Sequence, residues 1–288
     1  MPVNWRRNLY ALFAAQMLAI VAFSLRAPFL PFYLSDLGAT STDAQTLWSG
    51  IINAAGAGVM AITAPFWGAA ADRYGRKPML IRAMAAAVVT IALMSLATEV
   101  WHLLALRLVE GALTGTVTAA TALVAAGTPR DRLGYGLGLI QTAVFSGASL
   151  GPLAGGFLAD EIGFRPTFWI ASAMMAAAAL IVLWFVHEQF TPVQRVTTTG
   201  RGGFGGVWGL VAGRTLLTMI AAMLMIRLAS SAVQPIMPLF VEQLAHAAAG
   251  TASTLSGITL GIAGVTSAIS AVFLGRLGDR AGHRRILF

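Results

Sequence analysis

Long apolar stretches recur along this chain of 288 residues, and they constrain its fold more than any other feature. A helix needs about 20 predominantly apolar residues to cross the roughly 30 Å hydrocarbon core of a bilayer. Only 10% of the residues are charged, against about 25% in soluble domains, so the bilayer is the expected solvent. We expect eight membrane-spanning helices, at about residues 9–34, 47–70, 79–98, 101–126, 135–158, 164–187, 215–241 and 252–275.

Basic residues concentrate in alternate loops between the expected spans. Of the 19 lysines and arginines, 15 lie in the loops on one side, whereas the opposite loops carry Arg165 and several acids. Cytoplasmic loops of membrane proteins are enriched in lysine and arginine, so we expect a cytoplasmic N-terminus. The net charge of +8 then reflects topology. The sequence shows no continuous basic face with stacking aromatic residues, so we expect no nucleic-acid partner.

The chain matches itself when it is shifted by 207 residues. Pro28 and Pro31 align with Pro235 and Pro238, and 14 of the 50 positions in residues 28–77 are identical to their counterparts. The shift makes the seventh span the counterpart of the first, so each unit has six spans in the same orientation. Parallel repeats of this kind are typical of transporters that alternate access around a site at the membrane midplane.

The repeat predicts the domain organisation. We expect an N-terminal six-helix bundle over 1–188 and a cytoplasmic linker, rich in glycine and threonine, over 189–214. We expect an incomplete C-terminal bundle over 215–288, with two spans and the start of a third. Because the sequence ends where this third span begins, we interpret the chain as a C-terminally truncated transporter or a fragment of one.

Two loops at equivalent places in the repeat share one motif. Glycine, aspartate and basic residues recur in both, at Gly68, Asp72, Arg73, Gly75, Arg76 and Lys77 in the first half and at Gly275, Asp279, Arg280, Gly282, Arg284 and Arg285 in the second. The pattern resembles the cytoplasmic signature of the major facilitator superfamily. The resemblance implies an all-α membrane protein with the major facilitator fold, in which each loop is a conformational latch. The alternative, that these arginines are topology signals only, leaves the paired glycines and aspartates unexplained.

The resemblance also implies where the latches dock. The first latch is expected to dock on a helix late in the second half, which would lie beyond the end of this sequence. The second latch is expected to dock on the span at about 135–158, which is present. The expected truncation therefore affects the first latch and leaves the second with its partner.

Small residues dominate the fifth span. Gly147, Gly151, Pro152, Gly155 and Gly156 resemble the antiporter signature of the drug:proton antiporter branch of this superfamily. Glycines spaced by four residues form a flat helix face that allows close packing, and the proline removes a backbone donor and bends the helix. The alternative is a packing face with no role in transport direction.

Charged residues inside the expected spans are candidates for function, because a charge in hydrocarbon is costly and faces a cavity or a partner. Glu110 is the only acid within any expected span, and Arg107 shares its helix face. The segment from Arg107 to Gly111 resembles a further signature of the superfamily. Glu110 with Arg107 is the candidate for proton coupling, or else a static ion pair. Arg26, Arg107 and Arg227 are the candidate substrate-cavity residues.

Together these features predict a secondary active transporter and no enzyme. The sequence has no phosphate-binding loop, nucleophile motif or metal-ligand set, so we expect no cofactor. We expect proton-coupled efflux of small amphipathic molecules across a bacterial inner membrane, by a protein that is monomeric at full length. Many drug antiporters place a carboxylate in the first span, whereas this chain has Arg26. Two alternatives therefore remain: an organic-anion uptake or exchange permease, and a truncated remnant that does not transport.

Overall fold

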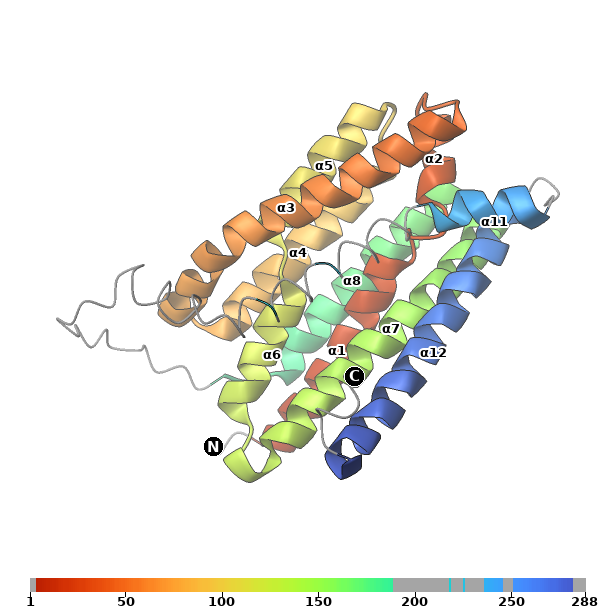
Figure 1. Ribbon diagram of the computed structural model, residues 1–288. Helices are drawn as coiled ribbons and strands as arrows, with labels where there is room; N and C mark the ends of the chain where they lie inside the picture. The colour runs from red at the N-terminus through yellow and green to blue at the C-terminus, as the bar shows by residue number, and fades with distance from the viewer. Residues whose placement is uncertain (1–3, 189–217, 219–224, 226–235, 246–250, 282–288) are drawn as a thin grey trace.

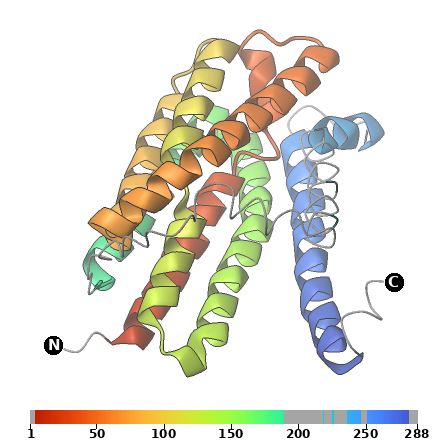
Figure 2. The same cartoon turned by 60° about the vertical axis from the view of Figure 1, so that its left-hand side comes forward.

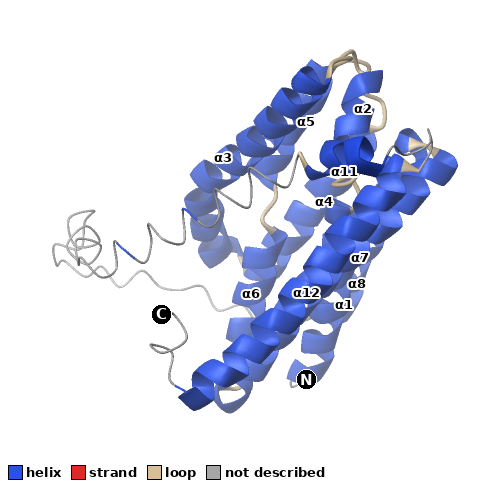
Figure 3. Ribbon diagram, turned by 45° about the vertical axis from the view of Figure 1, so that its right-hand side comes forward, coloured by secondary structure: helices blue, strands red, loops and turns tan. Residues whose placement is uncertain are grey.

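The computed structural model describes residues 4–188, 218, 225, 236–245 and 251–281. Helices account for most of these residues, and none of them lies in a strand (Figure 3). Six segments of this part of the chain are long and apolar enough to cross a membrane: Trp5–Ser24, Thr42–Tyr74, Arg76–Met94, Val100–Gly127, Arg130–Ile162 and Phe164–Phe185. They correspond to the first six expected spans, so the all-α membrane fold is confirmed.

The first six spans form one bundle, and a helix of the second half lies along its fifth span (Figures 1 and 2). The helices of the bundle are α1 (Trp5–Ser24), α2 (Leu30–Asp36), α3 (Thr42–Tyr74), α4 (Arg76–Met94), α5 (Val100–Leu113), α6 (Thr116–Gly127), α7 (Leu133–Ile162) and α8 (Phe164–Phe185), with a 3-10 turn η1 (Arg130–Arg132) before α7. The second half contributes α11 (Met237–Ala245) and α12 (Ala252–Ala281), of which α12 packs along α7. The expected linker at 189–214 lies outside the described residues.

The first span, expected as a helix at about 9–34, is broken. α1 ends at Ser24 and α2 begins at Leu30, with hydrogen-bonded turns between them. Pro28 and Pro31 account for the break, because proline lacks a backbone N–H and disfavours a helical conformation of the residue before it. The segment between the helices carries Arg26, so the break brings a charged side chain into the bundle.

The fourth span, expected at 101–126 and found at Val100–Gly127, is also broken into two helices. α5 ends at Leu113 and α6 begins at Thr116, and Gly115 between them has φ of +143°, a region that favours glycine. The break leaves the Ala112 carbonyl without its helical donor. The Trp67 indole N–H donates to that oxygen at 2.6 Å, which satisfies a backbone group that would otherwise be costly to bury.

Aromatic rings fix the far end of the first span against α8. Phe29 stacks on Phe164 and meets Phe168 edge-on, at centroid distances of 5.6 and 5.4 Å. Tyr33 packs on the same two rings, and its hydroxyl donates to the Met94 carbonyl at 2.8 Å. These contacts hold the end of the break that follows Arg26.

The basic helix ends lie together at the end of the bundle where the chain begins. Asn8 Nδ2 donates to the His187 carbonyl at 2.6 Å, and the amides of Arg76 and Lys77 donate to the Glu188 carboxylate. The starts of α1 and α7 also meet there, with Trp5, Arg6 and Arg132 around one pocket. The described parts of the basic loops, at the starts of α1, α4 and α7, are therefore on one end of the fold.

Candidate functional site

Glu110 lies at the centre of a charged cluster inside the bundle. Its side chain is 3% exposed, and its two oxygens accept hydrogen bonds from two different arginines. Arg26 Nη1 donates to Oε1 at 2.8 Å, and Arg107 Nη1 donates to Oε2. The carboxylate therefore joins the break between α1 and α2 to α5.

Asn53 of α3 belongs to the same cluster. Its Oδ1 accepts from Arg107 Nη2 at 3.1 Å, and its Nδ2 donates to the Ser49 carbonyl at 3.0 Å. Asn53 was not predicted, although an amide in the middle of the apolar stretch at 47–70 is a signal for it. Three spans of the first half thus meet at one set of hydrogen bonds, which we call the ion cluster: Arg26, Asn53, Arg107 and Glu110.

The ion cluster has more positive than negative charge. Two guanidiniums face one carboxylate, which gives a formal charge of +1, and Arg107 Nε has no hydrogen-bond partner among the described residues. Buried charges are tolerated when they are paired and hydrogen-bonded. The arrangement can hold an anion beside the arginines, and it can change its pairing when Glu110 gains or loses a proton. Arg227, the third predicted cavity arginine, lies outside the described residues.

Two glycines bring α3 and α5 into backbone contact beside the ion cluster. A Cβ atom on Gly111 would overlap the Gly56 carbonyl oxygen, and a Cβ atom on Gly56 would lie 3.3 Å from the Arg107 carbonyl oxygen. Helices approach this closely only where side chains are absent. The close approach places Arg107 within hydrogen-bonding reach of Asn53 on the neighbouring helix.

The glycine face of α7 packs against α1 and the segment that follows it. Three glycines with four-residue spacing form this face: Gly147, Gly151 and Gly155. A Cβ atom on Gly151 would lie 2.5 Å from Ser24 Cβ, and one on Gly155 would overlap the Leu25 carbonyl oxygen. Because Leu25 directly precedes Arg26, the face that resembles the antiporter signature supports the segment that carries one arginine of the ion cluster.

A second face of α7 meets α12. A Cβ atom on Gly156 would overlap the Ser253 carbonyl oxygen, and one on Gly257 would overlap the Pro152 carbonyl oxygen. Both Gly156 and Pro152 are buried within α7. The small residues of the fifth span therefore pack on both sides, against the first span and against the second half of the chain.

The first predicted latch lies at the turn between α3 and α4. Gly75 adopts φ of +100° and ends α3 where α4 begins. The Glu188 carboxylate accepts from the amides of Arg76 and Lys77 at 2.9 and 2.8 Å, which caps α4. Three further latch residues are exposed on the last turns of α3: Gly68, Asp72 and Arg73. The capping role of Glu188 was not predicted, because its two donors lie more than 100 residues away in the sequence.

The second predicted latch lies at the end of α12. Gly275, Asp279 and Arg280 belong to that helix, which extends to Ala281. The remaining three predicted residues of this latch lie outside the described residues: Gly282, Arg284 and Arg285. The helix that carries the second latch packs along α7, the span on which the resemblance places its docking site.

A bundle of apolar helices with paired charges in its interior is a feature of membrane transporters. The chain matches the Major Facilitator Superfamily over residues 12–288, and it belongs to this superfamily. Its members are transporters, so the chain is a multi-pass membrane transporter and not an enzyme, as the sequence predicts.

Curated relatives match almost the whole chain. The Multidrug resistance protein MdtG of Serratia proteamaculans (strain 568) is 40% identical over 286 residues, which are 99% of this chain and 69% of the relative. The protein of the same name from Citrobacter koseri is 40% identical over 99% of this chain and 70% of its own length. The chain therefore spans about two thirds of the length of these relatives.

Solved structures share the fold. A D323A mutant of the nucleoside transporter NupG superposes with a TM-score of 0.65, at 14% identity, over 94% of this chain and 69% of that chain. The human organic anion transporter MFSD10 (TETRAN) superposes with a TM-score of 0.58, at 24% identity, over 65% of this chain and 49% of that chain. At these identities the likeness shows the fold alone.

Proposed function

We propose that the chain carries out proton-coupled efflux of small amphipathic molecules by alternating access. Its membrane would be a bacterial inner membrane, with the N-terminus in the cytoplasm. The names of the MdtG relatives, multidrug resistance proteins, support an efflux function. The observation that carries the proton coupling is the bridging position of Glu110, a buried acid shared between two arginines.

Proton binding to Glu110 would change what holds the ion cluster together. The ionised carboxylate bridges Arg26 on the first span and Arg107 on the fourth. Protonation removes the negative charge and turns one oxygen into a donor. The two guanidiniums then lose their shared counter-charge and repel each other. The step links proton uptake to separation of the first span from the fourth, which favours one conformation of the transporter over another.

The fifth span would transmit this separation. Gly155 holds the Leu25 backbone next to Arg26, and Gly257 of α12 holds the Pro152 backbone on the other side of α7. A shift of the segment around Arg26 therefore reaches the second half of the chain through tightly packed backbone. We assign the glycine face of α7 to this coupling, and the loops around Asp72 and Asp279 to the latches that hold each conformation.

Glu110→Gln tests the proposal, because it keeps the size of the side chain and removes its charge. The full chain would be reconstituted in liposomes, and uptake of a fluorescent amphipathic cation would be driven by a proton gradient. We expect gradient-driven transport to fall at least tenfold, while exchange of the same dye without a gradient persists. Glu161→Gln, at an exposed acid near the end of α7, is the control. Unchanged gradient-driven transport in Glu110→Gln would refute a proton-coupling role.

The charge of the ion cluster favours a second candidate function, exchange of organic anions. The ion cluster has two guanidiniums and one carboxylate. The extra guanidinium provides a site for a carboxylate or phosphate group. In the same liposomes, this function predicts exchange of an organic anion at a rate that does not depend on the proton gradient. That exchange would be lost in Arg26→Gln and Arg107→Gln and kept in Glu110→Gln. Transport of the cation that requires the proton gradient would support proton-coupled efflux and exclude anion exchange.

A further inference from the structure

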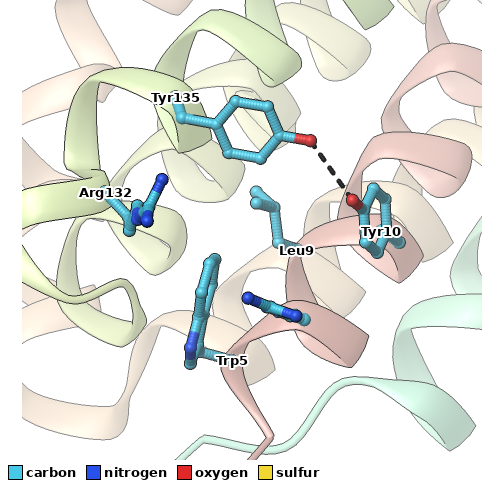
Figure 4. Close-up of a pocket in the computed structure, with 6 residues that line it drawn as sticks. Trp5, Leu9, Tyr10, Arg132 and Tyr135 are labelled. Carbon is cyan, nitrogen blue, oxygen red and sulfur yellow. Dashed lines mark hydrogen bonds between the residues drawn. The ribbon is translucent and has the colours of Figure 1, made fainter.

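A small pocket lies at the beginning of α1, far from the ion cluster. It has a volume of about 220 Å³ and is formed by the first turns of α1 and by the start of α7 (Figure 4). Its lining residues are Trp5, Arg6, Leu9, Tyr10, Arg132 and Tyr135. At 1.5 Å per residue along a helix, Arg6 lies roughly 30 Å from Arg26, so the pocket is separate from the proposed transport site.

The lining groups suit an anion with several oxygen atoms. Arg6 and Arg132 supply guanidinium donors from two different elements. The hydroxyls of Tyr10 and Tyr135, which also line the pocket, lie 3.2 Å apart (Figure 4). Asp131 does not line the pocket but pairs with Arg132, 3.4 Å from its Nε, and this pair is mostly exposed to solvent. The pocket therefore has a formal charge of +1 even with this acid included. Guanidinium forks and hydroxyls are the groups that proteins use to bind phosphate.

The pocket lies at the surface of the bundle, between the start of α1 and the start of α7. There Tyr10 of α1 meets Tyr135 of α7, and the two side chains are each about half exposed, at 54% and 52%. Next to Arg6 on α1, the Arg7 guanidinium lies 5.6 Å from the centroid of the Phe185 ring of α8. A headgroup can therefore reach the pocket from outside the protein.

The residue types of the pocket suit the level of the lipid headgroups. Tryptophan and tyrosine concentrate where the hydrocarbon meets the headgroups, and the pocket combines Trp5 with two tyrosines at a helix end. Basic side chains on the cytoplasmic side meet anionic lipids. The volume is below the roughly 300–1,000 Å³ typical of sites for drug-sized ligands, which fits a headgroup better than a transported molecule.

We propose that this pocket binds the phosphate of an anionic phospholipid headgroup at the cytoplasmic face of the membrane. The proposal uses the membrane orientation inferred from the arginines and is independent of the transported substrate. The two guanidiniums hold the phosphate oxygens, the tyrosine hydroxyls donate to the same group, and the acyl chains extend along the outside of the bundle. The lipid would tie the start of α1 to the start of α7.

Lipid titration of the purified full chain tests this site. Thermal unfolding would be followed in neutral detergent during addition of dioleoylphosphatidylglycerol, with dioleoylphosphatidylcholine and inorganic phosphate as separate arms. We expect the anionic lipid alone to raise the unfolding temperature. In Arg132→Gln the lipid concentration for half of the effect should rise at least fivefold. Arg130→Gln is the matched control, because Arg130 belongs to the same turn and does not line the pocket.

Three results would overturn the proposal. Equal weakening of lipid binding in Arg130→Gln and Arg132→Gln would mean that the basic surface attracts the lipid without a specific site. Equal stabilisation by phosphatidylcholine would mean that the charge is not recognised. The full effect with inorganic phosphate would mean that a free anion, and no lipid, is the ligand. Tyr135→Phe keeps every charge and serves if Arg132→Gln does not fold. We expect it to weaken lipid binding about twofold to threefold, and unchanged binding in that case would count against the site.

Discussion

At the scale of single residues, Trp67 stabilises the break in the fourth span through a hydrogen bond. Its indole N–H satisfies the Ala112 carbonyl at the break between α5 and α6, and the Arg82 guanidinium lies 3.2 Å from the centroid of its ring. Trp67→Phe keeps an aromatic ring under Arg82 and removes the donor. A buried acceptor left without a partner costs about 1–3 kcal/mol. We expect unfolding at a lower temperature, measured by the loss of the monodisperse peak after heating.

Trp169→Phe is the control for this change. Trp169 lies on α8 and is about half exposed, so its replacement should leave the unfolding temperature within a degree or so of the original protein. An equal loss in the two variants would show that the hydrogen bond to Ala112 contributes nothing beyond ring packing.

Glu188 presents a second residue-scale prediction. Its carboxylate accepts from two backbone amides at the start of α4, at 2.9 and 2.8 Å, where the helix dipole also favours a negative charge. Loss of such a cap typically costs about 1 kcal/mol. We expect Glu188→Ala to increase amide hydrogen exchange in the first turn of α4, measured by mass spectrometry. Glu188→Gln, which keeps one oxygen acceptor, should give a smaller increase.

The exchange pattern separates this cap from a general loss of stability. Asp131→Ala removes an exposed acid at the same end of the bundle and should leave α4 unchanged. If Glu188→Ala increased exchange equally in all helices, or left the first turn of α4 protected, the capping role would be refuted.

At the scale of helices, glycine sets the distances on which the ion cluster depends. The sequence predicted a glycine face on α7, because its glycines recur every four residues. Gly111 ends the segment that resembles a further signature of the superfamily, but nothing in the sequence indicated that it packs against Gly56 on another helix. Such a pair can be recognised only in the structure, where the two helices lie side by side. Each position favours glycine because the backbone of the other helix crowds the place of a Cβ atom.

Gly111→Ala tests the contact between α3 and α5. The new Cβ atom would overlap the Gly56 carbonyl oxygen, so the helices must move apart. Overpacking of this kind costs about 1–3 kcal/mol. The hydrogen bond between Arg107 and Asn53 spans the same gap and should be lost. We expect a lower unfolding temperature together with lower transport in liposomes.

Gly58→Ala is a matched control for this substitution. Gly58 lies in α3 with no atom within 4 Å of the position of a Cβ atom, so alanine meets no obstacle there and improves helix propensity. Its unfolding temperature should stay level or rise. A Gly111→Ala protein as stable and active as Gly58→Ala would show that the close approach is not required.

At the scale of the whole molecule, length and periodicity explain the bundle but not the interior of its site. The six spans follow from apolar length alone. The pairing of Arg107 with Glu110 follows from their spacing on one helix. The bond from Arg26 to the same carboxylate spans 84 positions in the sequence. It depends on a break in the first span and on the packing of α7 behind it, and both arise from tertiary contacts that no local pattern contains.

Membrane orientation is the whole-molecule property on which the proposals for direction and lipid binding both depend. The chain has no cysteine, so single cysteines can be introduced and labelled without a background. Asp43 and Glu99 are exposed at one end of the bundle, and Asp131 is exposed at the other. The sequence assigns fifteen basic residues to loops on the same side as Asp131, which predicts that this end stays in the cytoplasm, because translocating lysine and arginine is disfavoured.

An impermeant maleimide applied to whole cells should therefore label Asp43→Cys and Glu99→Cys. It should reach Asp131→Cys and Arg284→Cys only after the inner membrane is opened. Arg284→Cys tests the repeat itself, because Arg284 lies in the second unit and its counterpart in the first unit is Lys77. Two units in the same orientation place both loops in the cytoplasm, whereas units of opposite orientation would expose Arg284→Cys to the outside. Labelling of Arg284→Cys in closed cells would refute the parallel repeat, and labelling of Asp131→Cys would refute the orientation.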